Sequence, residues 1–165
     1  MAYLADGQLS AAETAIQKQL RVDPEMIGPR LLLAVLRAIL GQPDQATRLI
    51  LDCGVLDRPF QGVQAIAAYA LAKGDLRQRA HQLLEQALAH ILEGTSGVGA
   101  FGYWGLAALA LGRQQEAVDL LKLSIKHRCY SAPVLFSTPL IKPYSQTVAV
   151  RLFTSAMRRC FSASA

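Results

Sequence analysis

The chain has 165 residues, of which 52% are hydrophobic and 18% are charged, and its net charge is +5. This composition excludes a disordered chain, which would combine low hydrophobicity with high charge, and the length predicts a single domain. The mean hydropathy of +0.25 is high for a soluble protein, so we expect some apolar surface to meet a partner or a missing neighbour.

A repeat with a period near 34 residues runs from the first residues to about position 127. In each copy a glycine is followed five or six positions later by an alanine, and an apolar residue stands four positions after that alanine. The alanines are 34, 34 and 37 residues apart. The glycine and alanine pairs are Gly7/Ala12, Gly41/Ala46, Gly74/Ala80 and Gly112/Ala117, and the apolar residues are Ile16, Ile50, Leu84 and Leu121. Repeats of this length are typical of stacked helical hairpins.

An apolar run stands before each of the last three glycines, at Leu31–Leu40, Val63–Ala72 and Phe101–Leu111. We expect each run to be the first helix of a hairpin, because glycine adopts positive φ and ends a helix at low cost. The small alanine then lets the second helix approach the first closely. Sustained alternation of apolar and polar residues is missing, so the sequence predicts an all-α fold without strands.

The first copy is incomplete. Only Met1–Asp6 precede Gly7, too few residues for a first helix of three or four turns. We therefore expect a truncated first repeat. Either the chain is a piece of a longer protein, or this end pairs with another copy.

The arrangement resembles the tetratricopeptide repeat (TPR) over about residues 3–127. The small residue that the family has at its eighth position is matched by Ala34, Ala67 and Gly105. The closing proline is matched by Pro24 and, one residue late, by Pro59. The family's tyrosine in the middle of the first helix is absent. The resemblance implies a TPR-like helix-turn-helix solenoid over residues 1–127.

Residues 128–165 are expected to belong to the same domain but to leave the repeat. Three prolines, at positions 133, 139 and 143, predict an irregular path, because proline breaks helices. A last helix is predicted at Ser145–Cys160, and we expect it to cap the open end of the stack. Its predicted apolar face consists of Ala149, Leu152, Phe153, Ala156, Met157 and Cys160, with Arg151, Arg158 and Arg159 largely off that face.

Part of this segment resembles a more specific motif. Leu135–Pro143 followed by Phe153–Arg159 is similar to the closing motif of repeat domains fused to bacterial winged-helix transcription regulators, nucleotide cyclases and kinases. Here Val150-Arg151-Leu152 replaces the family's Asp-Pro-Arg step. The resemblance implies a regulatory or oligomerisation domain of a bacterial transcription regulator or signalling protein.

The TPR resemblance also implies a groove on the concave side, lined by the first helices. The inward positions carried over from the family bear none of the Lys, Arg or Asn residues that grip acidic C-terminal peptides. An apolar groove suits a packed helix with anchors at i, i+3 and i+4. The alternative is self-burial against the C-terminal helix or a second copy. The predicted groove residues are Leu31, Val35, Ala38, Gln61, Gln64, Ala68, Gly102, Leu106 and Leu109.

Candidate catalytic and cofactor motifs have simpler explanations. Gly97–Gly102 spells G-x-G-x-x-G, but a dinucleotide site needs a preceding strand, and Ala80–Leu92 is helical in pattern. His81 and Glu85 lack further ligands, and His127 and Cys129 are two apart and so point to different helix faces. The three cysteines form no C-x-x-C pair. We expect no enzyme activity, no metal and no cofactor.

Charge is distributed unevenly along the chain. Residues 120–165 carry a net charge of +7 and residues 1–119 carry −2. The basic residues are scattered and not interleaved with aromatics, so direct nucleic-acid binding is not predicted. Gly94–Gly112 has no charged residue, but glycines dilute it, and we expect a buried helix and no membrane span. An odd number of cysteines without a secretory signal favours the cytoplasm. Cys53 is expected in the core and Cys160 at the surface.

These patterns predict a non-enzymatic module that binds another protein, or a second copy of itself, through an apolar helical groove. The alternative function is a chaperone or assembly subunit of a secretion or pilus system. The sequence leaves open the identity of the partner, the oligomeric state and the parent protein.

Overall fold

The computed structural model describes residues 8–57, 61–93, 100–129 and 131–162, and all regular structure within these ranges is helical. The prediction of an all-α fold is confirmed for this part of the chain. The α-helices are α2 (Leu9–Val22), α3 (Ile27–Ile39), α4 (Pro43–Asp52), α5 (Gln61–Lys73), α6 (Arg77–Leu92), α7 (Phe101–Leu111), α8 (Gln114–Lys126), α9 (Ser131–Ser137) and α10 (Val148–Ser162), and the 3-10 helices are η1 (Val55–Asp57) and η3 (Pro139–Tyr144).

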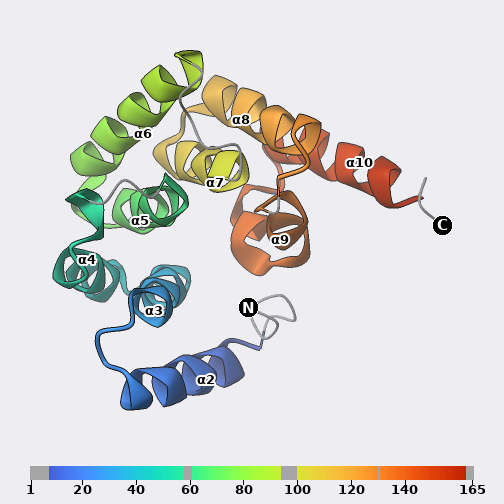
Figure 1. The fold of residues 1–165 in the computed structure, drawn as a ribbon. Coiled ribbons are helices and arrows are strands. Elements are labelled where there is room, and N and C mark those ends of the chain that lie inside the picture. Colours follow the sequence, from blue (N-terminus) through green and yellow to red (C-terminus); the bar gives the residue numbers. More distant parts are fainter. Residues whose placement is uncertain (1–7, 58–60, 94–99, 130, 163–165) are drawn as a thin grey trace.

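The helices follow one another in an arc (Figure 1). α3, α5 and α7 form an inner row, in which α3 contacts α5 and α5 contacts α7. α4, α6 and α8 form an outer row. Each packs against the inner helix before it, and α4 and α6 also contact the inner helix that follows. α2 packs mainly on α3 at one end of the arc.

The glycines and alanines that define the repeat occupy equivalent places in the helices that the structure describes. Ala12, Ala46, Ala80 and Ala117 are all buried. Gly41 and Gly112 end α3 and α7 with positive φ, of 71° and 79°, as predicted. Gly74 differs, since its φ is not positive. It is required by close packing instead, because a Cβ there would lie 2.8 Å from Thr47 Oγ1. Gly7 lies outside the described residues.

α7 is the most deeply buried helix of the array, because it lies between α5, α6, α8 and α9. Every residue from Phe101 to Leu109 is buried. Gly105 permits this close approach, since a Cβ there would lie 2.9 Å from Leu121 Cγ. The apolar character of α7 is thus explained by its neighbours. Within the described ranges no helix has both the length and the apolar stretch that crossing a bilayer requires.

The predicted irregular path through the three prolines is wrong, because two short helices form there. Pro133 is the third residue of α9, a first-turn position whose N–H would have no intrahelical acceptor in any case. Pro139 opens η3, where its fixed φ suits the first helical position. Pro133 and Pro139 therefore lie in the first turns of these helices, whereas Pro143 lies inside η3.

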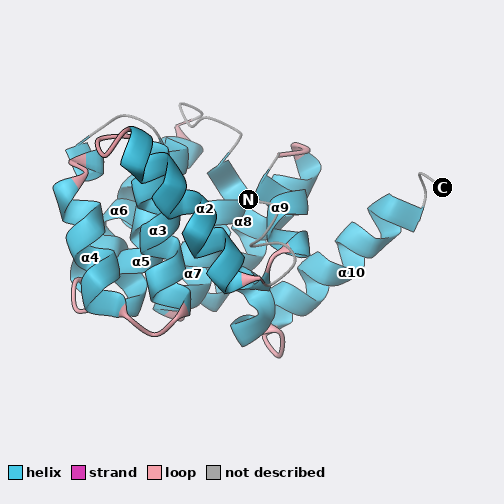
Figure 2. Ribbon diagram, turned by 90° about the horizontal axis from the view of Figure 1, so that it is seen from below, coloured by secondary structure: helices cyan, strands magenta, loops and turns pink. Residues whose placement is uncertain are grey.

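The last helix begins at Val148, three residues after the predicted start. Thr147 caps it, since its Oγ1 accepts a hydrogen bond of 3.3 Å from the N–H of Val150. The predicted apolar face is wrong in part. The buried residues are Ala149, Val150, Phe153 and Met157, whereas Leu152 is 48% exposed and Cys160 is exposed. This face packs on α8 and α9, and the rest of α10 extends away from the body of the molecule (Figure 2).

Candidate protein-binding cleft

The predicted groove residues lie on the inner row of helices, but most of them are covered. Leu31, Val35 and Ala38 on α3, Ala68 on α5, and Gly102, Leu106 and Leu109 on α7 are all buried. Gln64 is half-buried and donates a hydrogen bond of 3.3 Å from Nε2 to the carbonyl oxygen of Leu56. Gln61 begins α5, and its side chain lies outside the described part. These residues therefore act mainly as contacts between helices.

The C-terminal segment fills one end of the predicted groove. α9 and η3 both contact α7, and α9 lies inside the arc (Figure 1). The N–H of Gly102 donates a hydrogen bond of 3.2 Å to Ser131 Oγ. A Cβ on Gly102 would lie 2.7 Å from that same oxygen. The self-burial that the sequence left open thus occurs at this end, through α9 and η3 and not through the last helix.

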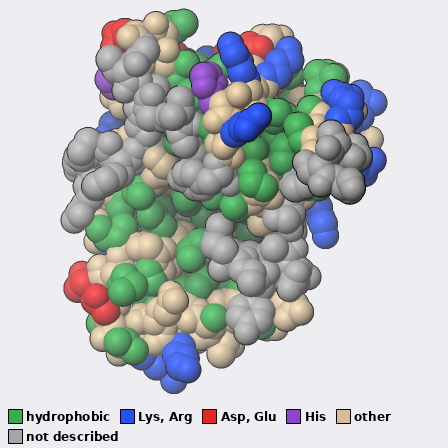
Figure 3. Space-filling view, turned by 45° about the vertical axis from the view of Figure 1, so that its right-hand side comes forward, with side chains coloured by type: hydrophobic (Ala, Val, Ile, Leu, Met, Phe, Trp, Pro, Cys, Tyr) green, Lys and Arg blue, Asp and Glu red, His purple; other side chains and the backbone are tan. Residues whose placement is uncertain are grey.

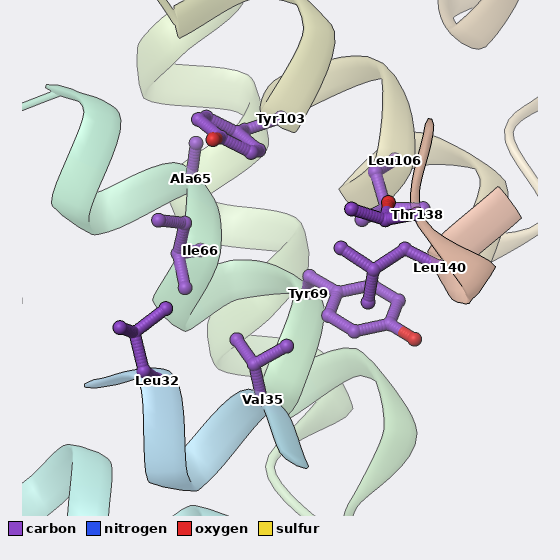
Figure 4. A pocket seen from close by; sticks show the side chains of 9 residues that line it. All are labelled: Leu32, Val35, Ala65, Ile66, Tyr69, Tyr103, Leu106, Thr138 and Leu140. Carbon is purple, nitrogen blue, oxygen red and sulfur yellow. The ribbon is translucent and has the colours of Figure 1, made fainter. Parts of the chain in front are cut away.

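A small apolar cleft remains where α3, α5 and α7 face the C-terminal segment. It encloses about 20 Å³, and its lining residues carry no charged side chain. In Figure 4 the side chains converge on this space from the three inner helices and from the segment at Thr138 and Leu140. Figure 3 shows hydrophobic side chains on the walls of a hollow in this face. The lining residues are Leu32, Val35, Ala65, Ile66, Tyr69, Tyr103, Leu106, Thr138 and Leu140.

Of the predicted groove residues, Val35 and Leu106 line this cleft. The repeat register placed the inward face about one residue away on α3 and α5, at Leu31 and Ala68. The residues that it missed include Leu32 and Ile66, which are half-buried and so have atoms within reach of solvent. The contribution of Leu140 follows from the tertiary fold, because that residue is far away along the chain.

Tyr69 lines the cleft, and Tyr144 lies near Tyr69 and beside Lys73 and Arg77. Burial raises the pKa of Tyr69 well above its usual value and raises the pKa of Tyr144 to about 12, so both phenols are neutral at physiological pH. The Tyr144 hydroxyl is buried without a hydrogen-bond partner among the described residues. Lys73 Nζ lies 4.9 Å from the centre of the Tyr144 ring, and burial together with the nearby charge of Arg77 lowers the pKa of Lys73.

Arg77 has a structural role in the same region. Its guanidinium donates hydrogen bonds of 3.3 Å to the carbonyl oxygen of Ala72 and 2.8 Å to that of Leu111. It thereby satisfies free carbonyl groups at the ends of α5 and α7. The cation is thus directed at backbone oxygens and not into the cleft.

The residues singled out for possible chemistry are placed apart from the cleft. Glu85 pairs with Arg113, which also bonds to Glu116 at 2.6 Å. The His127 ring lies 5.6 Å from that of Phe101.

Cys53 is buried as predicted, and Cys160 is exposed as predicted. Cys129 is also buried, and burial raises the pKa of its thiol. Among the described residues no three His, Cys, Asp or Glu side chains form a group that could hold a metal ion. Of the G-x-G-x-x-G pattern, residues 97–99 lie outside the described ranges, and Gly102 is inside α7.

The cleft offers apolar contact and little else. A polar or charged ligand would lose its hydration on entering without gaining hydrogen bonds, which costs several kcal/mol by order of magnitude. An aliphatic side chain has no hydrogen bonds to water to give up, so its transfer from water into the cleft is favourable. Comparison with family models, curated proteins and solved structures found no match to the chain.

Proposed function

We propose that this chain is a protein-binding module whose inner cleft accepts apolar side chains from another protein or from a second copy. The observation that carries the proposal is the apolar cleft itself, lined from α3, α5, α7 and the C-terminal segment without a charged side chain. Fully burying one leucine or phenylalanine contributes about 1.5–3 kcal/mol. A partner helix would place one such side chain at this small cleft.

We also infer that the array is a TPR-like solenoid with α10 as its cap. This is supported by the inner and outer rows of helices, by the buried alanine at each repeat mark and by the packing of α10 on α8. The similarity of Leu135–Pro143 to a closing motif of bacterial regulators supports a regulatory or oligomerisation role in such a protein. The cytoplasm suits buried thiols such as that of Cys53.

The proposal is tested by placing charge in the cleft at its half-buried positions. The double variant Leu32→Asp, Ile66→Asp should leave the helical circular dichroism intact and abolish self-association measured by light scattering. A photo-crosslinking residue at position 66, introduced into the chain in its native cells, should capture one defined protein. The matched control places the same changes at Leu51 and Leu92, which are 50% and 89% exposed and line no part of the cleft.

Two results together would overturn the proposal. One is a purified chain that is a monomer with and without the cleft substitutions. The other is a crosslinking pattern at position 66 that matches the pattern at position 92.

A further inference from the structure

The C-terminal end of the molecule carries a concentration of exposed positive charge. No Asp or Glu follows Asp119 in the sequence, whereas seven Lys and Arg residues do. All seven are exposed. Lys and Arg side chains gather on the upper right of the face in Figure 3, where α8 and α10 lie. The seven residues are Lys122, Lys126, Arg128, Lys142, Arg151, Arg158 and Arg159.

Six of these cations form no ion pair with another residue that the structure describes. The ion pairs between described residues involve cations at or before Arg113. Unpaired cations that lie close together repel one another, and an anionic partner relieves that repulsion. The basic residues that form no ion pair with a described residue are Lys122, Lys126, Arg128, Lys142, Arg151 and Arg158.

On α10 the cations share one face with exposed apolar side chains. Val148 and Leu152 are one turn apart and are 56% and 48% exposed. Arg151 and Arg158 are two turns apart on the same side of the helix, which is opposite to the buried face that packs on α8 and α9. We call this face the α10 stripe, and it spans roughly 16 Å at about 1.5 Å per residue. It consists of Val148, Arg151, Leu152, Ser155, Arg158 and Arg159.

We propose that the α10 stripe binds an acidic amphipathic helix of a partner protein. Val148 and Leu152 would contact apolar residues at i and i+4 of that helix, and the arginines would pair with its flanking Asp and Glu residues. Arginine suits this role because its guanidinium binds a carboxylate through two parallel hydrogen bonds. The stripe is separate from the inner cleft, since no residue of α10 lines that cleft.

An acidic helix fits the stripe better than other polyanions do. Exposed apolar anchors between the cations offer nothing to a phosphate backbone. Among the described side chains after Asp119, the aromatic residues Phe136, Tyr144 and Phe153 are at least partly buried, so stacking platforms for single-stranded nucleic acid are missing there. A membrane would need the main apolar face of α10, which is already packed on α8 and α9.

The experiment is a selection of peptides from an unbiased phage-displayed library on the full chain, followed by anisotropy measurements with the selected peptides. We expect acidic helical sequences with two apolar residues one turn apart. The variant Arg151→Glu, Arg158→Glu should weaken their binding by about tenfold or more, as should Leu152→Asp. The matched control Lys18→Glu, Arg21→Glu changes the net charge equally, at exposed positions of α2, and should weaken binding much less.

Circular dichroism establishes that the variants fold. If the charge reversal disturbs α10, the neutral variant Arg151→Gln, Arg158→Gln replaces it in the binding measurement. The proposal is overturned if the selected peptides are not acidic, or if the variants of α2 and α10 weaken binding equally. It is also overturned if duplex DNA or phosphatidylserine vesicles bind the chain more tightly than the peptides do and lose that binding with the α10 variant.

Discussion

Gly105 lies at the closest contact between α7 and α8. A Cβ at this position would lie 2.9 Å from Leu121 Cγ and 3.0 Å from its Cδ2, so the leucine would have to move. Alanine gains about 1 kcal/mol of helix propensity over glycine, but overpacking of a core costs about 1–3 kcal/mol. We therefore expect Gly105→Ala to lower the free energy of unfolding in urea by up to about 2 kcal/mol.

Gly28→Ala is the matched control for this change. Gly28 is the second residue of α3 and has no atom within 4 Å of its added Cβ, so the variant should be neutral or more stable by up to about 1 kcal/mol. Equal stability of the two variants would contradict a packing role for Gly105.

Tyr144 makes stability depend on pH in the alkaline range. Burial raises its pKa in the folded chain to about 12, above the value near 10 of an unfolded chain. The folded state therefore keeps the proton where the unfolded state loses it. The resulting stabilisation is fully present below pH 10 and is lost as the pH rises from about 10 to about 12.

Tyr144→Phe should remove this part of the alkaline loss and keep the aromatic ring beside Lys73. Because the hydroxyl has no partner among the described residues, the variant should be equally stable at pH 7, or more stable by about 1 kcal/mol. Urea unfolding of both proteins at pH 7, 10 and 11 measures the effect. Parallel curves of stability against pH would show that Tyr144 does not contribute.

At the scale of a helix, α10 places a core residue, Phe153, directly after Leu152, a residue of the proposed binding stripe. Phe153 is 2% exposed and packs in the main core, whereas Leu152 is 48% exposed. Removing a buried phenylalanine costs about 3–5 kcal/mol, and we expect this loss for Phe153→Ala in chemical denaturation. Leu152→Ala should change stability by no more than about 0.5 kcal/mol. A comparable loss in both variants would mean that α10 has another orientation in solution.

The sequence predicted the repeat helices better than the closing segment, for a physical reason. α3, α5 and α7 are apolar runs, each followed by a glycine, and the signals that form them are local. Pro133 and Pro139 misled the prediction, because the effect of a proline depends on whether it falls in the first turn of a helix. The buried face of α10 was predicted only in part. Leu152 was assigned to that face because it is apolar, but it is 48% exposed.

At the scale of the whole molecule, the candidate site depends on segments that are distant in sequence. The repeat register identified the inner row of helices, and with it Val35 and Leu106 of the cleft. The register did not predict that α9 and η3 cover part of the inner row by packing on α7. Leu32 and Ile66 stay half-buried and line the same cleft as Thr138 and Leu140 of the C-terminal segment. Such coverage arises from tertiary packing and has no signature in a local pattern.

The array should not unfold uniformly, because its two ends are packed differently. Ala12 and Ile16 of α2 form a small cluster with Leu36, separate from the main core that runs from α3 to α10. α2 packs mainly on α3, and a helix with few buried contacts opens before the core does. We therefore expect amides of residues 9–22 to exchange with solvent faster than those of α7.

Two alanine substitutions make this expectation specific. Ile16→Ala should speed exchange in residues 9–22 by at least about tenfold, because an Ile→Ala change in a core costs about 2–5 kcal/mol. The same variant should leave the exchange of α7 unchanged, since α2 packs mainly on α3. Leu121→Ala, in the main core, should speed exchange throughout α7 and α8. Uniform acceleration of all helices by Ile16→Ala would instead show that the array unfolds as one cooperative unit, with α2 an integral part of its core.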